Sequence, residues 1–142
     1  MAHVRKGRAK GAGRCNVYVP LEFLMDHELI HTQDKCLLKL KGDFTIQNVG
    51  EIRSSLLEAL EGSEPIEISL EEVTEMDASS LQLLCSAHRA SVLGQKQLKI
   101  TGELPAVAVQ SASAAGFMRQ MGCPIDAANT CLWIMEKEQC KR

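Results

Sequence analysis

Residues 66–81, IEISLEEVTEMDASSL, decide the fold because they join a strand pattern to the start of a helix. Apolar and polar residues alternate over 66–70, which predicts a β-strand with one buried face. Residues 71–75 are mostly acidic and predict a turn. A helix is predicted to follow, from position 79 or 80 to position 93. A strand followed closely by a helix is the basic unit of an α/β sheet.

Asp77, Ser79 and Ser80 cluster where this helix begins. The plain interpretation is capping, because such side chains accept hydrogen bonds from the free N–H groups of a first turn. The same geometry suits a regulatory site, since a phosphate on a first-turn serine meets free amides and the positive end of the helix dipole. That phosphate would add roughly 1.5–2 negative charges. The residues alone leave both interpretations open.

Further strands and helices alternate on both sides of this stretch. Asn48 and Glu51 have the spacing of a capping box, which predicts a helix over 49–61. The other predicted elements are strands at 27–31 (weakly supported), 35–41 (ended by Gly42-Asp43) and 96–101, a helix at 105–115, and a segment at 130–136 that suits a strand or a short helix. Helices that alternate with strands predict an α/β layer.

Composition and charge divide the chain into two parts. Its 142 residues are 45% apolar and 24% charged, as in an ordinary globular domain. Residues 1–24 carry a formal charge of +4, and residues 5–14 within them have no apolar period. This predicts a basic disordered extension, either a nucleic-acid or membrane-surface arm or an extra leader ahead of Met25. Residues 25–142 carry a charge of −6 and are predicted to form the domain.

The overall composition also limits the partners. The net charge of −2 and the aromatic content of 4% argue against a nucleic-acid partner. No apolar run reaches the ~20 residues of a membrane span, and the leading residues lack a secretory signal. We therefore predict a cytoplasmic protein without direct membrane insertion.

Motifs of enzymes and of metal sites are missing from the sequence. It contains no GxxxxGK[ST] phosphate loop, no GxGxxG and no GxSxG. Its six cysteines form no CxxC pair, and Cys36, Cys85 and Cys131 are predicted to be buried thiols because their neighbours are apolar. Cys140, near the tail, is predicted to be exposed and reactive. We expect no metal, no cofactor and no catalytic residue.

The histidines fit structural roles. His27 and His31 share a strand face, but no third metal ligand accompanies them. His88 lies on the predicted inner face of the second helix and is interpreted as a histidine at the edge of the core. The alternative is a general base acting with Asp77 or a cysteine. The predicted inner face comprises Leu81, Leu84, Cys85, His88 and Val92.

A family resemblance adds to this interpretation. The string Ile68-Ser69-Leu70, Val73, Met76-Asp77-Ala78-Ser79-Ser80-Leu81 resembles the STAS domain of anti-sigma factor antagonists, in which an Asp-Ser-Ser-Gly-Leu-like motif opens a helix after a strand. Leu38, Leu40 and Gly42-Asp43 resemble the first core strand of that family. The resemblance spans residues 35–122. It implies a single-layer mixed sheet of four to five strands, with three to four helices packed mainly on one face.

The resemblance also implies a function. In bacterial antagonists of this type, the second serine of the motif is phosphorylated by a partner kinase, an anti-sigma factor of the histidine-kinase-like class. Ser79 occupies that position, and Asp77 occupies the acidic position before it. Ala78 replaces the first serine of the motif. Ser80 replaces the usual glycine and is a second candidate phosphoacceptor. The implied protein regulates transcription without being an enzyme: it binds the kinase when unphosphorylated, releases it when phosphorylated, and is reset by a serine phosphatase.

A constitutive adaptor remains the alternative, because STAS domains also occur in chemotaxis-type signalling complexes and as subunits of lipid-transporting ABC systems. Either function needs a docking surface. If the strands at 35–41 and 66–70 are parallel neighbours, their carboxyl ends form one rim, where α/β sheets usually bind ligands. The predicted partner surface around Ser79 comprises Asp43, Thr45, Gln47, Ala78 and Ser80.

Overall fold

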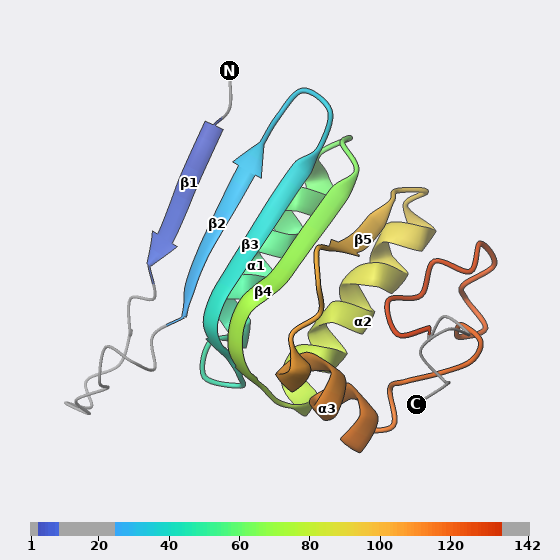
Figure 1. Cartoon of the computed structure of the whole chain (residues 1–142). Helices are drawn as coiled ribbons and strands as arrows, with labels where there is room; N and C mark the ends of the chain where they lie inside the picture. Colours follow the sequence, from blue (N-terminus) through green and yellow to red (C-terminus); the bar gives the residue numbers. More distant parts are fainter. Residues whose placement is uncertain (1–2, 9–24, 135–142) are drawn as a thin grey trace.

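The computed structural model describes residues 3–8 and 25–134, which form one five-stranded sheet and three helices. The elements are β1 His3–Arg8, β2 Asp26–His31, β3 Cys36–Phe44, α1 Val49–Glu61, β4 Ile66–Met76, α2 Ala78–Leu93, β5 Leu98–Thr101 and α3 Ala106–Ala114. Helices α1 and α2 pack together on one face of the sheet, and α3 lies near the end of β4 (Figure 1). The predicted α/β class and single-layer mixed sheet are confirmed.

The sheet combines two antiparallel pairs with two parallel pairs, and its strands lie in chain order from β1 to β5. Strands β3, β4 and β5 are parallel because a helix returns the chain to the same end each time. Leu29, Leu38 and Ile68 lie side by side across β2, β3 and β4 and are at most 2% exposed. The alternating residues read from the sequence therefore form the core face that α1 and α2 cover.

Strand β4 is longer than its alternating pattern indicated. The turn predicted at 71–75 is wrong, because the strand continues to Met76 and keeps pairing with β3. Val73 and Met76 are 4% and 6% exposed, so they anchor this extension in the core. The acidic residues Glu71, Glu72 and Glu75 project from a strand that pairing with the neighbouring strand supports, and local composition could not indicate this pairing.

Strand β3 likewise passes its predicted end at Gly42-Asp43 and reaches Phe44, which is fully buried. The register with β4 shifts between Lys39 and Lys41 and again between Gly42 and Asp43. Gly42 has φ 93°, a value that glycine adopts at little cost. The glycine therefore allows an irregularity within the strand instead of ending it.

The helices lie close to where the periodicity placed them, with two differences in detail. Helix α1 has the predicted bounds, but the capping box is wrong: Asn48 makes no side-chain cap, and its Nδ2 donates to the carbonyl of Asp43 at 2.7 Å. In α2 the predicted residues Leu81, Leu84 and His88 are buried. Cys85 and Val92 are only half-buried, and Ala87 and Ser91 complete the inner face.

Two end segments differ from expectation. Residues 3–8 were expected to be disordered, yet they form β1 along β2, because main-chain pairing at a sheet edge needs no apolar pattern. Residues 9–24 lie outside the described residues, and the domain boundary at 25 stays a prediction. Residues 130–134 are neither strand nor helix, apart from one bridge between Arg119 and Ile134. No helix among the described residues could cross a membrane.

Candidate functional site

The start of α2 is a fully formed N-terminal cap built by Asp77 and Ser80. Asp77 Oδ1 accepts the N–H of Ser80 at 3.1 Å, and Ser80 Oγ accepts the N–H of Asp77 at 3.2 Å. Ser80 Oγ also donates to the carbonyl of Asp77 at 2.7 Å. This reciprocal arrangement is a capping box, so the predicted capping role of Asp77 is confirmed.

The second carboxylate oxygen of Asp77 connects α2 to the loop that follows β3. Asp77 Oδ2 accepts the N–H of Ile46 at 2.8 Å, although the two residues are 31 positions apart. Residues 45–48, called the rim loop below, thereby lie against the first turn of α2. The parallel pairing of β3 and β4 makes this possible, because both strands end at the same edge of the sheet.

Asp77 is held in its ionised form. Burial raises the pKa of its carboxyl, but hydrogen bonds from Ser79, Ile46 and Ser80 favour the carboxylate more strongly, and the net pKa is lowered from 3.8. The cap therefore carries a negative charge at the positive end of the helix dipole, where such a charge is stabilising.

The two candidate phosphoacceptors differ in accessibility. Ser79 is half-buried, and its hydroxyl donates to Asp77 Oδ1 at the surface of the first turn. Ser80 is fully buried, and its hydroxyl is occupied within the capping box. The expectation that Ser80 belongs to a partner surface is therefore wrong, because the first helical turn points this side chain inward.

The rim loop and the end of β3 bring the other predicted surface residues to the same edge. Asp43 Oδ1 accepts the hydroxyl of Thr74 at 2.8 Å and is half-buried. The carbonyl of Thr45 accepts the N–H of Asn48 at 2.9 Å, which turns the loop into α1. Gln47 is exposed. The predicted juxtaposition of this loop with the Ser79 turn is confirmed through the bond between Ile46 and Asp77.

One residue of this surface, Ile46, was not predicted from the sequence. Ile46 is 66% exposed, a large apolar side chain beside the first turn of α2. The signal available in the sequence was an isoleucine inside an otherwise polar loop between a strand and a helix. Exposed apolar groups beside polar ones are common at docking sites.

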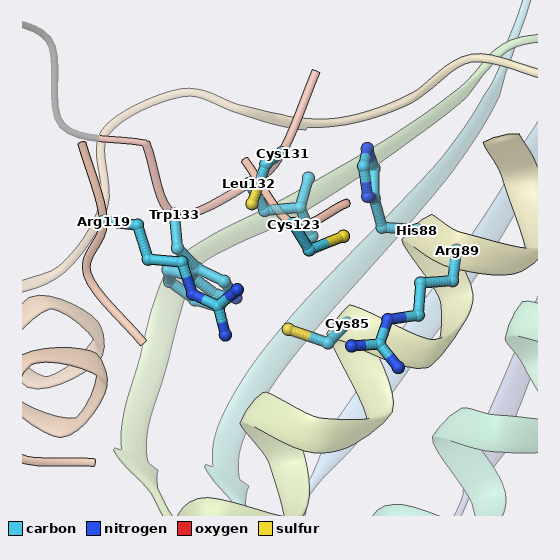
Figure 2. Close-up of a pocket in the computed structure, with 8 residues that line it drawn as sticks. All are labelled: Cys85, His88, Arg89, Arg119, Cys123, Cys131, Leu132 and Trp133. Carbon is cyan, nitrogen blue, oxygen red and sulfur yellow. The ribbon is translucent and has the colours of Figure 1, made fainter. Parts of the chain in front are cut away.

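A separate pocket lies between the second half of α2 and the segment that follows α3 (Figure 2). His88 is 4% exposed, and its Nε2 lies 2.9 Å from Thr130 Oγ1, in agreement with a histidine at the core edge. Asp77 is eleven positions away, or about 16 Å along a helix with 1.5 Å rise per residue. The structure therefore does not bring His88 and Asp77 together as an acid–base pair.

Three cysteines line this pocket. Burial raises the pKa of Cys85, whereas the N–H of Ile125 is the main cause that lowers the pKa of Cys123. Cys36 lies elsewhere, within the core, where burial raises its pKa to about 11. Cys36 is buried as predicted, while Cys85 and Cys131 are half-buried. Cys140 lies outside the described residues. Among the described residues, no group of three or more side chains is suited to hold a metal ion.

Comparison with known proteins identifies the family. Residues 27–119 match the family model described as "Mlab, STAS domain", and the chain belongs to this STAS family. No curated protein matches the chain in a sequence search. The family resemblance predicted from the strand and the Asp77-to-Leu81 motif is confirmed.

Two solved structures share the fold. The anti-sigma factor antagonist SpoIIAA in its unphosphorylated form matches with a TM-score of 0.55 at 17% identity, over 80% of this chain and 91% of that one. An anti-sigma factor antagonist from Mycobacterium paratuberculosis matches with a TM-score of 0.53 at 10% identity, over 65% and 78%. The crystal structure of Mglu matches at 15% identity with a TM-score of 0.48, over 53% of this chain and 19% of that chain.

Proposed function

We propose that the chain is a non-enzymatic regulatory binding module, similar to anti-sigma factor antagonists, whose partner binding is switched by phosphorylation of Ser79. The observation that carries the proposal is the first turn of α2, where Ser79 offers a partly exposed hydroxyl while Ser80 is buried. The two solved antagonists that share the fold support the class of partner. The partners are then an anti-sigma factor or related serine kinase, which supplies the ATP site, and a serine phosphatase, all in the cytoplasm.

The geometry around Asp77 supplies a physical mechanism for the switch. The unmodified hydroxyl of Ser79 donates to Asp77 Oδ1. A phosphate removes that donor and adds roughly 1.5–2 negative charges next to the ionised carboxylate. The resulting repulsion acts on the same carboxylate that holds the N–H of Ile46. Phosphorylation would therefore change the charge of the turn and loosen the rim loop, while the core stays folded.

The docking surface combines the first turn of α2 with the rim loop. Ala78, Ile46 and Gln47 are exposed, while Asp43 and Thr45 are half-buried beside them. The apolar side chain of Ile46 gives a partner a contact that a phosphate on the neighbouring turn would disfavour. Replacing Thr45 and Gln47 together by arginine should weaken partner binding by tenfold or more, on the order of 1.4 kcal/mol.

The first experiment is mass spectrometry of the full chain isolated from its host under phosphatase inhibition, with identification of the proteins that co-purify. We expect a phosphoryl group on Ser79, none on Ser80, and a kinase of the histidine-kinase-like class in the eluate. Ser79→Asp should then release that kinase, whereas Ser79→Ala should retain it. Ser86→Asp, an exposed change on the same helix, is the matched control and should also retain it. Equal binding by all three variants would contradict the switch.

A constitutive adaptor is the second candidate, and the description of the matching family, "Mlab, STAS domain", favours it. In this function the same docking surface binds a subunit of a lipid-transporting ABC system or a chemotaxis-type complex without any phosphate. Ser79 then only stabilises the first turn of α2 through its bond to Asp77. The same purification distinguishes the two candidates. An unmodified chain bound to an ABC ATPase or a signalling scaffold, with binding unaffected by Ser79→Asp, would support the adaptor.

A further inference from the structure

The pocket beside the second half of α2 gathers three of the four free cysteines among the described residues (Figure 2). Cys85 extends from α2, whereas Cys123 and Cys131 belong to the C-terminal segment, defined here as residues 119–134. The remaining lining residues are His88, Arg89, Arg119, Leu132 and Trp133. This pocket is separate from the Ser79 surface.

Hydrogen bonds hold the C-terminal segment against α2. The N–H of Arg119 donates to the carbonyl of Trp133 at 2.9 Å, which closes the segment into a loop. Asp126 accepts the N–H groups of Thr130 and Cys131, both at 2.8 Å. Thr130 in turn lies 2.9 Å from His88 on α2, measured from Oγ1 to Nε2. The loop that carries Cys123 and Cys131 is therefore held at the helix, and both cysteines line the pocket.

Arg89 lines the same pocket as the thiol of the helix and a thiol of the loop. It lies one helical turn after Cys85, on the same side of α2, and both residues line the pocket. Its positive charge lowers the pKa of Cys123 and, together with the larger effect of Arg119, partly offsets the rise that burial causes in the pKa of Cys85. Cys85 and Cys123 therefore share a cationic neighbour at the pocket.

The two thiols differ in a way that suits a two-step reaction. The N–H of Ile125 lowers the pKa of Cys123, burial opposes this, and the N–H of Asp126 and Arg89 add to the lowering. Burial raises the pKa of Cys85. Because the thiolate is the reactive form, Cys123 is the better nucleophile and reacts first, and Cys85 is the weaker nucleophile and reacts second.

We propose that this pocket is an oxidation site, at which a peroxide oxidises Cys123 and Cys85 then forms a disulfide with it, joining α2 to the C-terminal segment. In the first step the Cys123 thiolate attacks the peroxide: an S–O bond forms, the O–O bond breaks, and hydroxide or an alkoxide leaves. In the second step the Cys85 sulfur attacks the sulfenic acid: the S–S bond forms, the S–O bond breaks, and the oxygen leaves as water with the thiol proton. The two thiols lose two electrons, which reduce the peroxide.

The wild-type chain allows a direct test by peptide mapping. The folded full chain is treated with hydrogen peroxide, free thiols are blocked with iodoacetamide, and tryptic peptides are analysed without reduction. Cleavage after arginine and lysine leaves Cys85 in peptide 54–89 and both Cys123 and Cys131 in peptide 120–137. We expect these two peptides to appear linked through Cys85 and Cys123. Cys36 is the internal control and should remain unoxidised, because it is buried with a pKa of about 11.

Variants assign the roles of the thiols. Cys123→Ser should abolish the link, Cys131→Ser should retain it, and Cys85→Ser should leave a sulfenic acid on Cys123 that dimedone traps. Trp133, the single tryptophan of the chain, lines the same pocket, so its fluorescence should change upon oxidation of the wild type and not of Cys123→Ser. A bond between Cys123 and Cys131, or no link at peroxide concentrations that already oxidise Cys36, would overturn the proposal. Because the mapping uses the wild type, a variant that fails to fold does not prevent a decision.

Discussion

Asp77 and Asp126 both use a carboxylate to hold a loop beside α2, but they do so by different routes. Asp77 belongs to the cap of α2 itself and receives the N–H of Ile46 from across the sheet edge. Asp126 is 7% exposed, accepts two N–H groups of its own loop, and is connected to α2 through Thr130 and His88. The first arrangement begins from a local helix signal, whereas the second exists only once the loop has folded against the helix.

Acid should weaken both arrangements together, and we expect this to be the largest effect. Burial raises the pKa of each carboxyl, but N–H and O–H donors lower both pKa values below 3.8 overall. A carboxyl with a lowered folded-state pKa stabilises the fold above its unfolded value, and this stabilisation is lost as the pH falls through the folded value. The pKa of Glu67, lowered from 4.5 mainly by hydrogen bonds from Lys35 and Lys99, adds in the same direction.

The melting temperature should therefore fall steadily from about pH 5 to pH 2. Circular dichroism measures this midpoint, and Asp126→Asn should give a shallower fall than the wild type. A melting temperature that stays constant down to about pH 2 would show that the carboxylates do not stabilise the loops.

Removal of Asp126 should give the largest effect of a single substitution. Asp126→Ala removes the buried carboxylate that accepts the N–H groups of Thr130 and Cys131, and we expect a loss of about 2–3 kcal/mol in the free energy of unfolding. Urea denaturation measures this loss. Asp34→Ala, at an exposed turn, is the control and should change stability by less than about 0.5 kcal/mol. Similar values for the two variants would contradict the role of Asp126.

Removal of Asp77 should cost less, because its surroundings are partly open to water. Asp77→Ala removes the cap of α2 and the acceptor for Ile46, and we expect a loss of about 1–2 kcal/mol. Hydrogen exchange should become faster at the N–H groups of Ile46 and Ser80 in particular. Asp43→Ala, at the same edge, is the matched control and should leave those two rates unchanged. If hydrogen exchange at these two N–H groups were unchanged in Asp77→Ala, Asp77 would not be the residue that holds the rim loop against α2.

The smallest effects should separate the two serines. Ser80→Ala breaks a buried capping box and should cost about 1 kcal/mol, whereas Ser79→Ala removes one partly exposed bond and should cost less than about 0.5 kcal/mol. Thermal unfolding of both variants, side by side, measures the difference. A reversed order would mean that Ser79 is the structural serine, and Ser79→Ala could no longer serve as a neutral variant in binding studies.

Much of the fold could be predicted because the relevant forces act between near neighbours in the chain. Apolar periodicity placed α1 at its observed bounds and α2 within one or two residues. It failed for the end of β4, where acidic residues resemble a turn and only pairing with β3 keeps the strand extended. It failed again at Asn48, whose side chain bonds the carbonyl of Asp43 instead of the helix.

The candidate site shows the same division. The Asp77–Ser80 cluster could be read as a helix start, because a cap needs only residues three positions apart. Which serine points outward, and the contribution of Ile46, could not be read, since both depend on the packing of α2 and of the rim loop. The thiol pocket gave no sequence signal at all, because Cys85 and Cys123 are 38 positions apart and form no recognised motif.

The sequence by itself therefore determined the α/β class, the helix that follows Asp77 and the STAS resemblance, because each rests on periodicity or on a short contiguous motif. Tertiary structure alone decided that the rim loop binds Asp77, that Ser80 is buried while Ser79 is accessible, and that cysteines from the helix and the C-terminal segment face one pocket. The hydrogen bonds of Ile46 with Asp77 and of Thr130 with His88 join residues 31 and 42 positions apart, so only the parallel strands and the packed helix bring them within bonding distance.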